Sequence, residues 1–449
     1  MQTASSPLPA QPSGPTLARK LGLFDTTMLV MGGTIGGGIF VNPYVVAERV
    51  HTPALVLGAW IAGGLIALTG ALIYAEIANR LPKVGGQYAY LREAYHPVIA
   101  FLYGWVLLLV IQTGGMAVVT SIFSRYFIEL TGIHAPDWLV GILTLTILTI
   151  TNCIGVKSGS NLQSALMILK ILAISLLVVA GVVLVRGPHL SFKPIIGQPI
   201  SAGLISSFGA AMVPVLFAYG GWQTGCFVAG EMKEPRRDLP RALIFGVIGV
   251  AVLYSSVNFV YLRGLGVNGL AQTHTPATAV MRIALGDVGA LIIALGIALS
   301  TLGFLSQSVL TAPRVYFAMA EDRVFFRKLA WVHPKTQVPV FAIILQSVWT
   351  VVILLSGRYE QILNYVTSMD WIFFGLTASC LFILRSRSKV VAPIRMPGHP
   401  VTTALFCLVC WAVAANAIYT APKDTLIGMA ILVSGVPLYF IWKRWSFER

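Results

Sequence analysis

Two short segments of this chain have the composition to bind a small zwitterion through their backbone. The first is the glycine cluster at 31–40 (MGGTIGGGIF), and the second is 213–222 (VPVLFAYGGW). Glycine costs roughly 1 kcal/mol relative to alanine in a helix interior, and proline removes a helical hydrogen bond. Each segment is therefore predicted to interrupt a helix and to expose backbone groups.

An interrupted helix offers two kinds of ligand group. The new half-helix N-terminus carries about +0.5 elementary charge and unpaired N–H groups, which suit a carboxylate. Unwound carbonyl oxygens suit an ammonium group. An α-amino acid carries both. For one glycine cluster alone, close packing of two helices explains the composition equally well.

The elements that position these segments are membrane helices. Of the 449 residues, 57% are hydrophobic and 10% charged, and the mean hydropathy is +0.81, as expected of an all-α integral membrane protein. Alternating strands typical of a β-barrel are not evident. We predict twelve transmembrane helices, at about 25–49, 53–79, 98–128, 138–155, 161–185, 203–230, 241–262, 287–312, 338–356, 362–384, 401–420 and 424–442.

The two interruptions fall in the first and sixth of these helices. A unit of five helices, when repeated, enters the membrane in the opposite direction, so the two breaks would face each other antiparallel. Paired interruptions at matching positions of two inverted halves indicate a substrate site near the bilayer midplane.

The distribution of charge predicts the orientation. Most of the 31 Lys and Arg residues fall in loops on the side of the N-terminus, which places both termini in the cytoplasm and the chain in the cell membrane. Residues 1–18 are predicted to be a disordered tail and 443–449 a second cytoplasmic tail. The net charge of +15 is attributed to this bias, and no nucleic-acid partner is expected.

The histidines and cysteines give no sign of catalysis. The seven His residues form no His-Glu-x-x-His pattern, and the five Cys residues lie mostly within apolar segments. We therefore expect no enzyme activity, no metal and no cofactor. A channel would need a continuous polar lining and a repeated filter loop, which we do not find.

Four motifs give the chain a family resemblance. The segment 36–40 (GGGIF) resembles the Gly-Ser-Gly-Ile-Phe signature of the amino acid-polyamine-organocation (APC) superfamily, and 217–222 (FAYGGW) is similar to the sixth-helix motif of its L-type amino acid transporter branch. The loops at 74–94 and 231–242 resemble the loops after the second and sixth helices of that branch. The resemblance covers 19–442.

This resemblance implies one carrier domain that works by alternating access. Its inverted repeats would span about 25–185 and 203–384, with two further helices at 401–442. By the same resemblance, the glycines of the first break bind the substrate carboxylate, the carbonyls of the second bind the amino group, and Phe217 is an aromatic lid. The substrate-binding residues expected in the two breaks are Thr34, Ile35, Gly36, Gly37, Gly38, Phe217, Ala218, Tyr219, Gly220 and Gly221. Relatives often have serine at the position of Gly37.

Three further residues are candidates for coupling or conformational roles. Lys170 lies deep in the fifth predicted helix and matches a lysine that, in sodium-independent relatives, resembles a fixed substitute for a sodium ion; proton transfer and snorkelling are the alternatives. Ser300 is a polar residue of the eighth predicted helix. The alternative to a coupling or conformational role is a hydrogen bond that holds two helices together. Asp370 is an intramembrane acid for a proton relay or an outer gate, or else a structural or vestibule residue. Gln112 and Asn258 are candidates to line the transport path.

The resulting hypothesis is a sodium-independent exchanger of small or mid-sized neutral L-amino acids. A proton-coupled symporter and a polyamine or organic-cation carrier of the same superfamily remain alternatives.

The expected partners are the amino acid substrate and the lipid bilayer. The loop at 129–138 contains no cysteine, whereas eukaryotic relatives carry one there for a heavy-chain disulfide, so we expect no such partner. A monomer is a separate expectation. Charged residues of the inner loops are predicted to form a cytoplasmic gate or simply a solvated face.

Overall fold

The computed structural model describes residues 17–186, 191–195, 202–356, 359–387, 392–420 and 422–447. The tail predicted at 1–18 lies outside these residues up to position 16. Leu17, at its end, is buried against Phe317 and Val332. The second predicted tail is described as far as Phe447.

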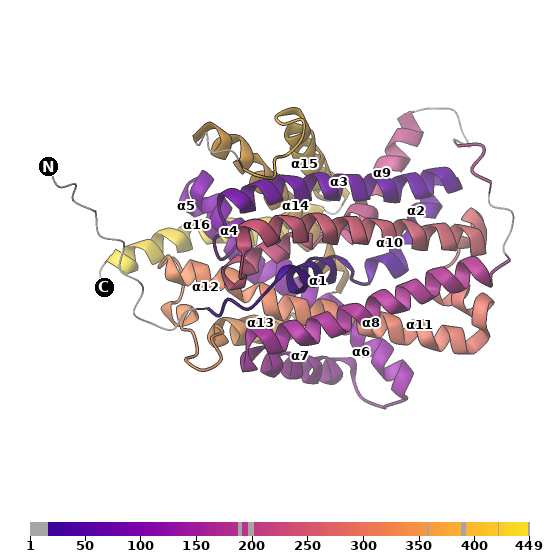
Figure 1. Cartoon of the computed structure of the whole chain (residues 1–449), viewed down its shortest axis with the longest axis horizontal. Helices are drawn as coiled ribbons and strands as arrows, with labels where there is room; N and C mark the ends of the chain where they lie inside the picture. Colours follow the sequence, from indigo (N-terminus) through magenta and orange to yellow (C-terminus); the bar gives the residue numbers. More distant parts are fainter. Residues whose placement is uncertain are drawn as a thin grey trace.

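Apart from one isolated bridge between Leu21 and Met232, the regular structure of the described residues is helical. Most helices run side by side along the long axis of the molecule (Figure 1). The helices are α1 (Leu23–Thr34), α2 (Gly38–Val50), α3 (Pro53–Arg80), α4 (Gln87–Ala94), α5 (Pro97–Val106), the π-helix η1 (Leu107–Ile111), α6 (Gln112–Thr131), α7 (Asp137–Ile154), α8 (Val156–Val183), α9 (Ala202–Ala218), the 3₁₀ helix η2 (Trp222–Glu231), α10 (Pro235–Ala271), α11 (Pro276–Thr311), α12 (Pro313–Glu321), the 3₁₀ helix η3 (Arg327–Ala330), α13 (Val340–Ser356), α14 (Tyr359–Arg387), α15 (Val401–Thr420) and α16 (Pro422–Phe447).

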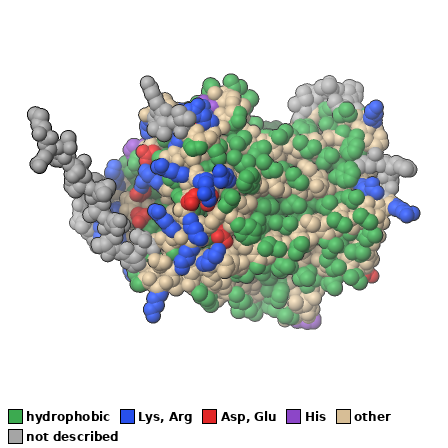
Figure 2. Space-filling model, viewed as in Figure 1, with side chains coloured by type: hydrophobic (Ala, Val, Ile, Leu, Met, Phe, Trp, Pro, Cys, Tyr) green, Lys and Arg blue, Asp and Glu red, His purple; other side chains and the backbone are tan. Residues whose placement is uncertain are grey.

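Nine helical segments within the described residues are long and apolar enough to cross a membrane, and the bent pair α1–α2 makes a tenth. An apolar surface covers the middle of the molecule, while Lys and Arg gather at the end where the described part of the chain begins and ends (Figures 1 and 2). This is the arrangement expected of a multi-span membrane protein, because hydrocarbon accommodates apolar side chains and excludes charged ones.

Two helices extend well beyond the predicted spans. We expected 241–262 and 287–312, whereas α10 covers Pro235–Ala271 and α11 covers Pro276–Thr311. The prediction followed apolar runs, but a helix continues into the polar interface wherever its backbone hydrogen bonds can continue. Gly266 and Gly286 interrupt these extensions with φ of 65° and 66°, a left-handed conformation that favours glycine.

Both predicted interruptions are present. The helix α1 ends at Thr34 and α2 begins at Gly38, with a 44° bend between them. The helix α9 ends at Ala218, and Gly221, with φ of 98°, turns the chain into η2. The π-helical turn η1, between α5 and α6, was not predicted, since its sequence LLLVI is an ordinary apolar run.

Ion pairs join several helices at the end of the molecule where the described part of the chain begins and ends. Arg314 and Glu231 are both fully buried, with Nε 2.7 Å from Oε2. Arg385 binds Glu76 at 2.6 Å, and Arg92 pairs with Asp322. These pairs link α12 and the residue that follows it to η2 and α4, and they link α14 to α3. Within the loops at 74–94 and 231–242, Lys83 pairs with Glu93, and Arg237 pairs with both Glu234 and Asp238.

Candidate functional site

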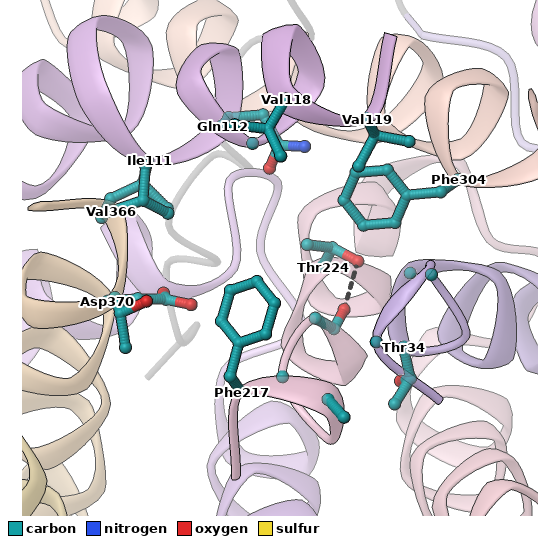
Figure 3. A pocket seen from close by; sticks show the side chains of 18 of the residues that line it. Thr34, Ile111, Gln112, Val118, Val119, Phe217, Thr224, Phe304, Val366 and Asp370 are labelled. Atoms are coloured by element: carbon teal, nitrogen blue, oxygen red, sulfur yellow. Dashed lines mark hydrogen bonds between the residues drawn. The ribbon is translucent and has the colours of Figure 1, made fainter. Parts of the chain in front are cut away.

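A cavity of about 130 Å³ lies where the two breaks meet. Its walls come from α1, α2, η1, α6, α9, η2, α11 and α14, and Figure 3 shows side chains pointing into it from several of these helices. The lining residues are Gly33, Thr34, Gly36, Gly37, Gly38, Ile111, Gln112, Gly115, Val118, Val119, Leu216, Phe217, Ala218, Gly220, Gly221, Gln223, Thr224, Phe304, Gln307, Val366, Thr367, Asp370 and Trp371.

The first break presents a helix N-terminus to this cavity. Gly37 is the N-cap of α2 and Gly38 is its first residue. The N–H groups at such a position have no carbonyl partner within their own helix, and the helix dipole adds partial positive charge. The segment can therefore bind an anionic group such as a carboxylate.

The two breaks touch through their backbones. A Cβ atom added to Gly221 would lie 2.0 Å from the carbonyl oxygen of Gly33, and one added to Gly33 would lie 2.6 Å from the carbonyl oxygen of Gly221. The hydroxyl of Tyr254 on α10 lies 3.1 Å from the carbonyl oxygen of Thr34 and 3.2 Å from that of Ala218. Glycine is thus required at positions 33 and 221 by close approach, and Tyr254 holds the two breaks together.

Lys170 and Ser300 lie behind the first break. The Lys170 ammonium is fully buried and donates to the carbonyl oxygen of Ile35, and the Ser300 hydroxyl donates to the carbonyl oxygen of Gly36 at 3.3 Å. Carbonyl oxygens that the break leaves without helical partners therefore receive donors from α8 and α11.

Most of the predicted binding residues reach the cavity, but two do not. Thr34, Phe217 and the glycines at 36–38 and 220–221 line it, as does Ala218. Ile35 is 0% exposed and Tyr219 only 2%, and the Tyr219 hydroxyl donates to the carbonyl oxygen of Trp60. For these two positions, side-chain contact with a ligand is not available in this structure, because the unwound backbone turns them toward the protein interior.

Asp370 is the one charged side chain among the lining residues. It lies on α14, and its neighbours Val366, Thr367 and Trp371 line the cavity with it, since positions i, i+1, i+4 and i+5 share a helix face. Gln112 also lines the cavity, whereas Asn258 is buried elsewhere and donates to the carbonyl oxygen of Tyr254.

Several lining residues were not predicted. Gln223, Thr224, Phe304 and Trp371 line the cavity, and the amide of Gln307 donates to the Thr224 hydroxyl at 2.6 Å. The polar pair at 223–224, directly after the second break, was a usable signal. The aromatic residues carried none, since most aromatic residues in such helices pack in the core.

The sequence matches a known family and several named relatives. The model of the amino acid permease family matches residues 21–441. The chain is 32% identical to the serine/threonine exchanger of Bacillus subtilis (strain 168), over 95% of this chain and 98% of the relative. It is 30% identical to the human large neutral amino acids transporter small subunit 2, over 96% of this chain and 82% of the relative. It is 28% identical to the human cystine/glutamate transporter, over 96% of this chain and 86% of the relative.

Proposed function

This chain belongs to the amino acid permease family and is an amino acid transporter rather than an enzyme, and we propose that it is a sodium-independent exchanger of small or mid-sized neutral α-amino acids. The observation that carries this proposal is the meeting of the two breaks in one cavity. The first break supplies N–H groups for the carboxylate, and the second supplies carbonyl oxygens for the ammonium group.

The contacts of Lys170 support sodium independence. A sodium ion binds oxygen ligands, including carbonyls of unwound helix segments. The Lys170 ammonium already donates to the carbonyl oxygen of Ile35, and Ser300 donates to the next carbonyl. A fixed positive charge at this position repels a metal cation and replaces its contact with the break.

The size of the cavity supports a small or mid-sized substrate. A buried water needs about 10–15 Å³, so 130 Å³ accommodates on the order of ten non-hydrogen atoms. A relative bears the name serine/threonine exchanger and another the name large neutral amino acids transporter. We propose that this chain prefers small amino acids, of the size of serine and threonine, to large neutral ones.

The proposed architecture has twelve transmembrane helices in a five-plus-five inverted repeat. Nine apolar segments and the α1–α2 pair account for ten, and we assign α13 and the α9–η2 pair as the remaining two. The Lys and Arg side chains gather at the end where the described part of the chain begins and ends (Figures 1 and 2), which supports cytoplasmic termini and a location in the cell membrane. We further propose a monomer without a disulfide-linked heavy chain, in keeping with the absence of cysteine from the sequence at 129–138.

The test is uptake of labelled amino acids into proteoliposomes that contain the purified protein. Uptake that requires an internal amino acid, and that is unchanged when choline replaces sodium, is the expected result. A parallel set of vesicles carries a pH gradient and no internal amino acid. Uptake driven by that gradient alone would refute exchange in favour of proton-coupled symport.

A further inference from the structure

The carboxylate of Asp370 is the feature of the cavity that the proposed exchange does not use. It is partly buried on α14 and lines the cavity, and no described residue donates a hydrogen bond to it or forms an ion pair with it. The lining residues include no Lys, Arg or His. A carboxylate in such surroundings is stabilised by a donor, so a ligand group that supplies one gains affinity.

The position of Asp370 indicates which part of an amino acid supplies that donor. In Figure 3, Asp370 and Thr34 lie on opposite sides of the cavity, and the ring of Phe217 projects between them. The α-carboxylate and α-ammonium groups are assigned to the two breaks, on the side of Thr34. The part of a substrate that extends toward α14 is therefore its side chain.

We propose that Asp370 selects amino acids whose side chains carry a hydrogen-bond donor, namely a hydroxyl or a carboxamide, over amino acids of the same shape without one. This inference rests on the proposed function and narrows its substrate class. The apolar lining contributed by Val366 and Ile111 fits the carbon stem of such a side chain, and the carboxylate accepts from its polar end.

The amide side chain of Gln112 strengthens the assignment. It lines the same cavity from α6, and Figure 3 shows it on a side of the cavity different from that of Asp370. An amide both donates and accepts, so a hydroxyl bound to Asp370 leaves an oxygen that other polar lining groups can satisfy. A methyl group of the same size can neither donate to Asp370 nor accept from the other polar lining groups.

The experiment compares threonine with valine, which differ by one hydroxyl in place of one methyl group. Tracer exchange in proteoliposomes gives kcat/KM for each amino acid with the full-length protein and with Asp370→Asn and Asp370→Leu. The expected threonine-to-valine ratio is at least about tenfold for the unmodified protein, falls toward one in Asp370→Leu with valine exchange retained, and is intermediate in Asp370→Asn.

The matched control is Ser368→Ala, two positions away on the same helix. The Ser368 hydroxyl donates to the carbonyl oxygen of Tyr365 within α14 and does not line the cavity. The threonine-to-valine ratio of the Ser368→Ala protein should therefore equal that of the unmodified protein. Size-exclusion profiles and threonine-induced shifts in Tm establish that each variant is folded.

Three outcomes overturn the inference. An unmodified protein that exchanges both amino acids equally well lacks the selectivity, although the proposed function then stands. An unaltered ratio in both Asp370 variants removes Asp370 from selection. Loss of valine exchange in a monodisperse Asp370→Asn protein assigns Asp370 to the α-ammonium group or to gating instead. An unmodified protein that exchanges no amino acid refutes the proposed function itself.

Discussion

The ammonium group of Lys170 donates a hydrogen bond to the carbonyl oxygen of Ile35, in the break between α1 and α2. This contact joins a fully buried lysine on α8 to the segment that offers its N–H groups to the cavity. The state of the first break is therefore coupled to a side chain outside the cavity lining.

Replacement of Lys170 by Met is expected to lower exchange at least about tenfold. A hydrogen bond to a charged group contributes about 1.5–3 kcal/mol, and its loss leaves the carbonyl of Ile35 without this donor. Ser300→Ala removes a neutral hydrogen bond of 3.3 Å and should cost less. Initial rates of exchange in proteoliposomes measure both effects, and a Lys170→Met protein with the unmodified rate would remove Lys170 from the mechanism.

Gly221→Ala is expected to disrupt the contact between the two breaks. The residue has φ of 98°, and its added Cβ would lie 2.0 Å from the carbonyl oxygen of Gly33. Gly58→Ala is the matched control, because a Cβ at Gly58 meets nothing within 4 Å. Thermal unfolding in detergent should show a clear loss of Tm for Gly221→Ala alone; equal Tm values in the two variants would argue against the close approach.

Gly37→Ser is expected to fold normally and to bind amino acids more tightly. An added Cβ would lie 3.7 Å from Cδ1 of Ile122, an ordinary contact, and serine is accepted at a helix N-cap. A neutral hydrogen bond contributes about 0.5–1.5 kcal/mol, so affinity should rise by a few-fold to about tenfold. Isothermal titration with threonine is the measurement. Weaker binding with unchanged Tm would place the added hydroxyl outside the carboxylate site.

Arg314→Met is expected to destabilise the protein by about 3–5 kcal/mol, because it leaves the buried carboxylate of Glu231 without its partner. Combination with Glu231→Leu should recover much of the loss, since it removes the unpaired charge. Lys83→Met breaks an exposed pair with Glu93 and should change stability by no more than about 1 kcal/mol. Urea unfolding, or Tm in detergent where unfolding is irreversible, ranks the three variants. A double variant less stable than Arg314→Met would contradict this account.

The sequence predicted the breaks because glycine and proline act locally on the backbone. The run at 31–40 and the segment at 213–222 lie where α1 gives way to α2 and α9 to η2. Lys170 was singled out by its depth in an apolar helix and by the family resemblance, but its contact with the carbonyl oxygen of Ile35 comes from the structure. The burial of Tyr219 was not foreseen, because an unwound segment has no period from which the direction of a side chain can be read.

The far side of the cavity depends on packing between helices distant in sequence. Asp370 was recognised as unusual from its charge, but its position in the same cavity as Gly36 depends on how α14 packs against α6 and η1. The boundaries of α10 and α11 were underestimated for a related reason, since hydropathy reports the membrane and not the end of the helix.

The most direct test of the central claim is equilibrium binding of labelled threonine to the purified protein and to Gly36→Val. A Cβ at Gly36 would lie 3.8 Å from Cδ2 of Phe304, so the variant should fold, while its branched side chain fills the cavity beside the start of α2. With Gly58→Ala as the control, the account predicts that Gly36→Val is monodisperse, keeps its Tm and loses binding at least about a hundredfold. Unchanged affinity in that variant would contradict the assignment of the two breaks as the amino acid site.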